Sequence, residues 1–510
     1  MEDAEQQRDH TDGTTRHVDV LIVGAGLTGI GAAWRLQSTH PGKTYLIVEA
    51  REEIGGTWDL FRYPGIRSDS DMQTFGYRFR PWREPRAIAD GASILQYIRD
   101  TAAEAGIDRH IRFRHRVVSA SWSTADASWK VELLRDGDVE TTTMTCGFLY
   151  MCTGYYRYDK GYAPHFAGRE KFTGRVVHPQ QWPQDLDCAD KRVVVIGSGA
   201  TAVTLVPTLA RTASHVTMLQ RSPTYIISLP SKDPIASGLQ RLIGKRAAYP
   251  IVRWKNIAIN SASYQLGQHA PAISRAFIRG RLKRLLPKGY DIGTHFNPRY
   301  KPWDQRLCVV PDADLFKAIG DGRASVVTDA IESFSESGVR LTSGQELSAD
   351  VVVTATGLDL VGLGGIQLFV DGDEIVLSDT VAYRGVMLSG VPNLVFTVGY
   401  TNASWTLKAD LVSQFACRLL AHMDRHGHRQ CVPTEPPGAT RRPLLDFSAG
   451  YVQRSIDRLP RSGTEDPWRS GNNYVRDFVT FKRARLDDQA LHYSSPDPAT
   501  AAVHPARTAS

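Results

Sequence analysis

Apolar runs that end at glycine, each followed by helical periodicity, occur in two separate parts of the chain. In the first part, the pattern predicts a buried strand over residues 18–23, a helix over 27–37 and a second strand over 44–48. The same order of strand, helix and strand returns between residues 192 and 219. Each part has the length and order of a βαβ unit from a dinucleotide-binding domain. We therefore expect an α/β protein with two Rossmann-like domains and two nucleotide sites.

The loop of the first unit has the sequence Gly24-x-Gly26-x-x-Gly29. Its first glycine permits a tight turn, the second lets the backbone approach a pyrophosphate, and the third lets the helix meet the strand. Backbone N–H groups at the start of the helix then face the phosphates. Glu49 ends the next strand, where a carboxylate accepts hydrogen bonds from the ribose of an unphosphorylated adenosine. FAD fits this first site, with a solvated strand end as the alternative for Glu49.

The loop of the second unit is followed by a cation instead of an acid. Arg221 takes the position that Glu49 has in the first unit, and its guanidinium can form a fork onto a 2′-phosphate. Ser222 can donate a further hydrogen bond to that phosphate. This site therefore favours NADPH over NADH, with a plain surface arginine as the alternative. The loop itself consists of Gly197, Ser198, Gly199, Ala200, Thr201, Ala202 and Val203.

A second pair of glycines, Gly55-Gly56, follows the first unit and continues with Thr57 and Trp58. Two adjacent glycines allow the backbone to come close to a ligand, here the flavin. Thr57 can donate a hydrogen bond to a phosphate, and Trp58 can cover the cofactor. A plain turn with a packed tryptophan is the alternative interpretation.

Two matching strand patterns, residues 148–154 and 351–357, end on a Thr-Gly turn and resemble the chain crossings of flavoproteins that bind two dinucleotides. Helical periodicity with proline and glycine breaks predicts an insertion in the second domain. The expected layout is a flexible N-terminus (1–16), the FAD-binding domain, first part (17–154), the NADP-binding domain (155–350) with its helical insertion (about 231–300), the FAD-binding domain, second part (351–493), and a flexible tail (494–510).

Between the two glycine loops lies a stretch that matches the F-x-G-x-x-x-H-x-x-x-W-P fingerprint of Baeyer–Villiger monooxygenases. The chain also matches that family's R-Y-P-G-x-R-x-D segment at residues 62–69 and its segment around Arg306 at residues 303–308. It resembles the family from about residue 19 to residue 485 and is most similar to the ethionamide-activating subgroup. The fingerprint residues are Phe172, Gly174, His178, Trp182 and Pro183.

The resemblance implies a reaction and the residues that carry it. NADPH would reduce FAD, dioxygen would add to form a peroxyflavin, and its anion would attack a ketone carbonyl to give an ester or lactone. Arg306 would stabilise the negative charge on the peroxide and on the tetrahedral adduct, and Asp69 would orient Arg306. A structural ion pair and a turn cap are the respective alternatives. His178 would serve as a hinge of the linker rather than as a base, with simple packing as the alternative.

The resemblance also implies cofactor contacts. The chain departs from many relatives at Gln305, where a lysine would help to hold the NADPH phosphate; Lys301 or Arg221 would have to compensate. NADP contacts are expected from Arg67, Ser68 and the loop 197–203. FAD contacts are expected from Thr28, Glu49, Thr57, Trp58, Asp59, Leu60, Asp69 and Val117.

These residues predict a Baeyer–Villiger monooxygenase that also oxygenates sulfur in thioamides or sulfides. The alternative is a flavin N- or S-monooxygenase without ketone activity, against which Trp182 and Arg306 argue. A third reading is a cofactor-binding or membrane-associated protein that has lost its chemistry, which Asp69 and Arg306 disfavour. A disulfide reductase is also disfavoured, since no redox cysteine pair lies near the flavin loop.

Composition sets limits on location and partners. The six cysteines form neither a C-x-x-C motif nor a zinc spacing, which indicates free thiols in a reducing cytosol and no metal site. No signal-peptide pattern is visible, and no apolar run approaches the ~20 residues that span a bilayer. We expect a cytoplasmic enzyme whose partners are dioxygen and a small ketone, thioamide or sulfide.

Charge is unevenly distributed along the chain. Residues 232–301 contain fourteen basic residues and only two acids, in a chain whose formal net charge is +7. A solvated helical face is one interpretation, and contact with the anionic inner face of the cell membrane is the other. No nucleic-acid reader motif accompanies the charge, so nucleic acid is not an expected partner.

Overall fold

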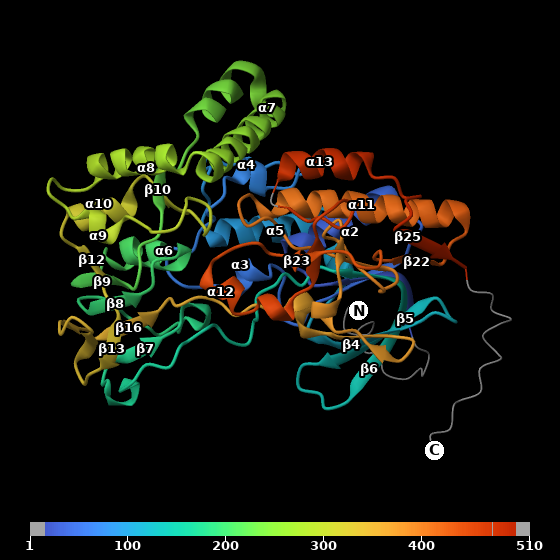
Figure 1. Cartoon of the computed structure of the whole chain (residues 1–510), viewed down its shortest axis with the longest axis horizontal. Coiled ribbons are helices and arrows are strands. Elements are labelled where there is room, and N and C mark those ends of the chain that lie inside the picture. The colour runs from blue at the N-terminus through green and yellow to red at the C-terminus, as the bar shows by residue number, and fades with distance from the viewer. Residues whose placement is uncertain (1–15, 472, 496–510) are drawn as a thin grey trace, which may run out of the picture.

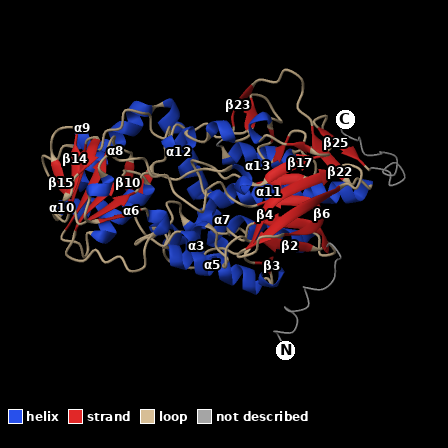
Figure 2. Ribbon diagram, turned by 90° about the horizontal axis from the view of Figure 1, so that it is seen from below, coloured by secondary structure: helices blue, strands red, loops and turns tan. Residues whose placement is uncertain are grey.

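Two sheets, one at each end of the molecule, carry the two predicted βαβ units (Figure 1). The computed structural model describes residues 16–471 and 473–495. The central strands of both units pair in parallel and are buried on both faces, which explains why they appear in the sequence as continuous apolar runs. Helices lie between and along the two sheets (Figure 2).

The first sheet has nine strands and combines parallel pairing around β1 with an antiparallel meander of β4, β5 and β6. β21 (Leu394–Phe396) pairs with β6 beside the main path. In spatial order the main path consists of β18 (Asp373–Glu374), β17 (Gln367–Val370), β4 (His115–Ser123), β5 (Ser128–Arg135), β6 (Thr141–Met151), β1 (Arg16–Val23), β2 (Tyr45–Val48) and β3 (Ile111–Arg112).

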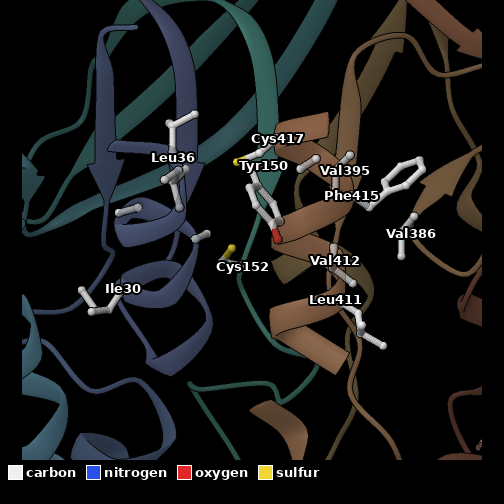
Figure 3. Close-up of a cluster of buried hydrophobic side chains, with 14 of the residues drawn as sticks. Ile30, Leu36, Tyr150, Cys152, Val386, Val395, Leu411, Val412, Phe415 and Cys417 are labelled. Atoms are coloured by element: carbon white, nitrogen blue, oxygen red, sulfur yellow. The ribbon is translucent and has the colours of Figure 1, made fainter. Parts of the chain in front are cut away.

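Helices cover one face of the first sheet. Ile30 and Leu36 of α2 (Leu27–Thr39) pack in one buried cluster with Phe415 of α11 (Trp405–His426) and Tyr150 of β6 (Figure 3). This cluster fixes the glycine loop at the end of β1 because the helix after that loop is part of the same core. The three helices are α2 (Leu27–Thr39), α5 (Gly91–Glu104) and α11 (Trp405–His426).

The second sheet is parallel throughout. Helices α6 (Ala200–Leu209) and α10 (Asp314–Gly320) pack on it through apolar side chains such as Leu205 and Phe316. In spatial order its strands are β12 (Ala324–Thr328), β9 (His215–Gln220), β8 (Arg192–Ile196), β16 (Val351–Thr354) and β7 (Arg175–Val177).

The predicted insertion is helical and projects from the second domain (Figure 1). It consists of α7 (Pro234–His269), α8 (Pro271–Leu285) and α9 (Ile292–His295). α7 is kinked at Gly244, whose φ of +79° lies outside the helical region. No helix of the described ranges combines the length and apolar character needed to cross a membrane.

The remaining elements are short and connect or edge the two domains. The helices are α3 (Thr57–Leu60), α4 (Met72–Phe75), α12 (Gly450–Gln453) and α13 (Tyr474–Arg483). The strands are β10 (Ile226–Leu229), β11 (Cys308–Pro311), β13 (Ile331–Phe334), β14 (Gly338–Leu341), β15 (Glu346–Ser348), β19 (Ala382–Tyr383), β20 (Met387–Leu388), β22 (Gln430–Pro433), β23 (Arg441–Pro443), β24 (Arg461–Gly463) and β25 (Leu491–Ser494).

Three expected domain limits are corrected by the strand pairing. β16 pairs with β7 and β8, so the second domain extends through Thr354 instead of ending at residue 350. Arg16, expected in the flexible N-terminus, begins β1, and Ser494, expected in the tail, pairs with Gln430. Residues 1–15 and 496–510 of the expected flexible ends lie outside the described residues.

The two chain crossings between the domains lie side by side. Val361 N–H donates to Tyr155 O, and Arg157 N–H donates to Asp359 O, at 2.9 Å each. These bonds join the two segments in which the chain passes from one domain to the other, directly after the Thr-Gly turns that follow β6 and β16. The crossings therefore form one double-stranded joint between the sheets.

Candidate active site

A cavity of about 1380 Å³ is lined by loops of both domains. Gly24 and Gly26 contribute to it from the first loop, and Gly197 and Gly199 from the second. The loops follow β1 and β8, at the carboxyl ends of parallel strands, where ligands bind in doubly wound sheets. One cavity therefore receives both predicted nucleotide sites.

The first glycine of each loop has a backbone conformation that other residues rarely adopt. Gly24 has a φ of +106° and Gly197 a φ of +134°. A Cβ atom at Gly24 would lie 2.8 Å from Cys152 O, and one at Gly197 would lie 2.3 Å from Ala355 O. Both tight turns thus require glycine, as the sequence predicted for this position of the motif.

Helices α2 and α6 begin at the cavity without a side-chain cap. Their N-cap residues, Gly26 and Gly199, accept no hydrogen bond through a side chain, and neither helix has an acid in its first turn. In contrast, Asp90 caps α5 and Asp233 caps α7. A Cβ atom at Gly199 would meet nothing within 4 Å. The free N–H groups and the open space fit the phosphates of two dinucleotides.

Glu49 lines the first site and also shapes its loop. Its carboxylate accepts hydrogen bonds from Ala25 N–H at 2.7 Å and from Arg51 N–H at 3.0 Å. The side chain is buried, and this burial raises the pKa of the carboxyl group. Its position at the end of β2, against the cavity, is compatible with the proposed contact to a ribose.

Arg306 and Asp69, which are 237 residues apart in sequence, form a two-pronged ion pair inside the cavity. Arg306 Nε lies 2.6 Å from Asp69 Oδ2, and the Arg306 terminal nitrogen donates to Asp69 Oδ1 at 2.8 Å. The accessible third of the Arg306 side chain faces the cavity. The Asp69 carboxylate raises the pKa of Arg306 further, so the guanidinium stays charged at every working pH.

Three tyrosines to which the sequence had assigned no role stand around this pair: Tyr155, Tyr156 and Tyr451. Burial raises the pKa of each of these phenols, so each keeps its proton near neutral pH. Tyr155 and Tyr156 directly follow the Thr-Gly turn at the first crossing, and this position could have predicted that they lie near the cavity. Tyr451 lies on the short helix α12, and no sequence motif indicated that it would line the cavity.

Trp405 is a further residue of the cavity wall without a predicted role. It begins α11 and donates from Nε1 to Thr28 Oγ1 of α2 at 2.8 Å. This bond joins the two helices at the edge of the first site. Thr28 itself lines the cavity, as do Thr57, Trp58, Ser68 and Val117 among the expected FAD and NADP contacts.

Arg221 lies at the rim of the second site with its guanidinium exposed to the cavity. Nearby, Ser198 Oγ and Thr224 Oγ1 are 2.7 Å apart, and Ser222 also lines the wall. Within the described part of the chain, no ion pair or hydrogen bond engages the Arg221 side chain. Gln305 lines the cavity, whereas Lys301 does not. The arginine is therefore the free cation available to a 2′-phosphate here.

Five of the expected cofactor contacts do not line the cavity. Asp59 is buried, and its carboxylate is paired with both Arg51 and Arg62. A Cβ atom at Gly29 would lie 1.9 Å from Gly24 O, so this glycine serves the contact between helix and strand. The other three pack beneath the wall: Leu60, Ala202 and Val203. Arg67 does line it and is paired with Asp314 at 2.6 Å.

The fingerprint residues lie outside the main cavity. His178 lines a second cavity of about 830 Å³ beside the crossings and accepts a hydrogen bond from Gln180 N–H at 3.2 Å. Burial lowers the pKa of His178. Gln180 in turn donates to Arg157 O of the first crossing at 2.8 Å. The described residues contain no cluster that could hold a metal ion. A hinge role for His178 stays a prediction.

The other members of the fingerprint act in packing. Phe172 is buried against Phe334, with ring centroids 5.9 Å apart, and Trp182 is half-buried at the core of the second domain. A Cβ atom at Gly174 would lie 2.5 Å from Asp350 O. The fingerprint thus runs along the second sheet, and two of its members, His178 and Pro183, line the second cavity beside the crossings.

Comparison with known proteins gives a consistent result. Residues 22–84 match the NAD(P)-binding Rossmann-like domain, and residues 77–248 match the flavin-binding monooxygenase-like family. The chain is 55% identical to the FAD-containing monooxygenase EthA of Mycobacterium tuberculosis over 94% of this chain and 98% of that protein. It is 49% identical to the putative FAD-containing monooxygenase MymA of the same organism, over 94% and 98%.

Among solved structures, OTEMO in complex with FAD and NADP has the same fold. The TM-score is 0.73 at 21% sequence identity, over 94% of this chain and 100% of that chain. At this identity the likeness concerns the fold alone. It agrees with the arrangement of two dinucleotide domains around one cavity.

Proposed function

The chain belongs to the family of FAD-containing flavin monooxygenases, and on this premise we propose that it is a Baeyer–Villiger monooxygenase. It is an oxidoreductase that uses FAD and NADPH to convert ketones into esters or lactones, and it also oxygenates sulfur in thioamides or sulfides. The balanced reaction consumes one ketone, one dioxygen, NADPH and a proton, and releases the ester, water and NADP⁺.

One observation carries this proposal, the two-pronged ion pair of Arg306 and Asp69 between the two dinucleotide loops. Attack on a ketone carbonyl places negative charge on oxygen, and a fixed guanidinium in a cavity stabilises such charge better than water does. Asp69 holds the guanidinium at two points, so Arg306 has little freedom to reorient. The pair therefore suits carbonyl chemistry, whereas simple sulfur oxygenation has less need of it.

The cofactors fit the residues on either side of this pair. The start of α2, Glu49, Thr57 and Trp58 would hold FAD, and the start of α6 with Arg221 would hold NADPH. FAD reduced by NADPH supplies the electrons that activate dioxygen. The chain's own residues bind and orient the two cofactors and place a permanent positive charge where oxygen becomes negative.

The function is tested on purified protein with NADPH, dioxygen and a panel of linear and aromatic ketones beside a methyl sulfide. We expect esters, identified by mass, from at least one class of ketone, together with sulfoxide from the sulfide. Sulfoxide without any ester would favour the N- or S-monooxygenase alternative. Hydrogen peroxide as the only product would contradict an oxygenase role for these substrates.

Replacing Arg221 with alanine is expected to reduce kcat/KM for NADPH by about 10- to 100-fold, because a charge-assisted contact to the 2′-phosphate is lost. The value for NADH, which lacks that phosphate, should hardly change. Steady-state kinetics with both nucleotides measures the effect. Arg116→Ala is the matched control, since Arg116 is an exposed arginine that lines the cavity beside Val117 of the first site. An unchanged NADPH preference in Arg221→Ala would contradict the assignment.

A further inference from the structure

The exposed large hydrophobic side chains of this protein are concentrated on one part of its surface. Of the fourteen such side chains in the described ranges, ten fall within residues 229–277 and two on α13. Only Val139 and Val376 lie elsewhere. Single exposed apolar residues are common on proteins, but a concentration of this kind marks an interaction surface.

Helix α7 has one face anchored in the protein. Arg253 is buried and donates to Gln73 O at 2.6 Å and to Gly76 O at 3.1 Å. Ile257 packs with Tyr400, which lines the main cavity. The orientation of the helix is therefore fixed, and its opposite face is turned outwards.

The outward face of α7 is apolar. Leu242 is 81% exposed and Ile259 is 60% exposed, with Ile251, Trp254 and Leu266 between 41% and 50%. Beyond the kink at Gly244, these residues recur at the spacing of one helical stripe. Apart from the contact of Trp254 with α13, these side chains keep two fifths or more of their surface exposed.

The neighbouring helices continue the same surface. On α8, Ser274 and Ile278 are buried, whereas Ile273 and Phe277 are each 62% exposed. On the other side, Trp254 of α7 packs edge-on against Phe478 of α13, with ring centroids 5.2 Å apart. Figure 1 shows α8, α7 and α13 along one edge of the molecule. We call their exposed sides the outer helical face.

Basic residues accompany the apolar ones. Residues 232–301 hold fourteen Lys and Arg against Asp233 and Asp291. Asp233 caps α7 and pairs with Lys255, and Asp291 caps α9, so both acids are engaged. Arg279, Lys283 and Arg284 of α8 are exposed, and no described acid pairs with them. The outer helical face thus carries a positive charge that its own acids do not neutralise.

We propose that the outer helical face docks in the interface of an anionic lipid bilayer, with α7 and α8 lying in the membrane plane. Apolar side chains enter the boundary of headgroups and acyl chains, and the exposed lysines and arginines meet anionic headgroups. A second copy of this chain fits poorly because two strongly positive faces repel each other. Nucleic acid would use the charge but not the apolar stripe.

The test measures binding of the FAD-loaded full-length protein to lipid vesicles by flotation. We expect binding to phosphatidylcholine vesicles that contain about one third phosphatidylglycerol, and weaker binding to phosphatidylcholine alone or at high salt. Two double variants of α8 test the apolar and the charged part of the outer helical face separately. Ile273→Glu/Phe277→Glu changes the apolar side chains, and Lys283→Glu/Arg284→Glu reverses the charge. Each should weaken binding at least ~tenfold.

Matched controls use the same substitutions elsewhere. Val139→Glu and Lys130→Glu change one exposed apolar and one exposed basic side chain outside the outer helical face, and should bind vesicles like the unchanged protein. In addition, lipids brominated near the headgroup should quench less fluorescence in Trp254→Phe than in the unchanged protein. The proposal is overturned if the unchanged protein stays off anionic vesicles or if the α8 variants bind as well as it does. It is also overturned if the unchanged protein is a dimer in solution and the α8 variants convert it to a monomer.

Discussion

An Arg306→Ala variant is expected to form oxygenated product from a ketone about 10²- to 10³-fold more slowly than the unchanged protein. Asp69 holds the Arg306 guanidinium at two points in the cavity, and loss of one preorganised donor at a developing oxyanion costs roughly 3–4 kcal/mol in the transition state. NADPH should still be oxidised, because neither glycine loop is altered. Most of the electrons should then appear as hydrogen peroxide, so the measurement is the ratio of ester to peroxide for each NADPH consumed.

Two further variants separate the role of Arg306 from a general effect of charge. Arg454→Ala removes another arginine of the cavity wall. Arg454 lies over the ring of Tyr162 at 3.5 Å and donates to Leu358 O, and no carboxylate among the described residues forms an ion pair with it. Its ester yield should stay within a few-fold of normal. Arg306→Lys keeps the charge but cannot form the fork with Asp69, so it should remain impaired. Ester formation at a near-normal rate in Arg306→Ala would refute the assigned role.

The sequence was sufficient for those parts of the site that depend on backbone conformation. Gly24 and Gly197 are predictable because each occupies a turn with positive φ where a Cβ atom would collide with a neighbouring carbonyl. The contrast between Glu49 and Arg221 at matching strand ends likewise predicts two types of adenosine from charge alone. Local chemistry of this kind is visible in a short stretch of chain.

Features that depend on the meeting of distant segments were less predictable. The family resemblance implied a cofactor contact at Asp59, but Arg51 and Arg62 pair with its carboxylate in the folded chain. Tyr451 reaches the ion pair only because α12 is folded against the crossings. The sequence around Tyr451 contains no motif that would indicate this position.

The helical insertion illustrates a third limit. In α8, the sequence places apolar residues all round the helix, and Ile273 and Ile278 look equivalent. Only the packing shows that Ile278 is buried while Ile273 is 62% exposed. Periodicity therefore predicted the helix but not the face that stays free. The apolar component of the outer helical face is visible only in the fold, whereas its charge was visible in the sequence.

The second large effect concerns stability, and it is expected for Lys408→Met. Lys408 Nζ lies 2.7 Å from Asp477 Oδ2, which also accepts from the Tyr400 hydroxyl at 2.7 Å, and the Lys408 side chain is only 5% exposed. Removal of the lysine leaves a buried carboxylate without its cation, which costs about 3–5 kcal/mol. For a chain of this length we expect thermal unfolding, followed by circular dichroism, to shift down by roughly 3–5 °C.

The loss should come from the unpaired charge and not from the missing packing, because methionine nearly fills the space of lysine. The double variant Lys408→Met/Asp477→Asn removes that charge and keeps an acceptor for Tyr400, so it should unfold at a higher temperature than Lys408→Met alone. Arg485→Met is the matched control, since its pair with Asp487 is 79% and 61% exposed and should contribute under ~1 kcal/mol. If Lys408→Met and Arg485→Met lower the unfolding temperature equally, the buried pair between α11 and α13 has no special role in stability. Tyr400 donates to Asp477 and also lines the cavity, so the buried pair connects the packing of α11 and α13 to the wall of the site.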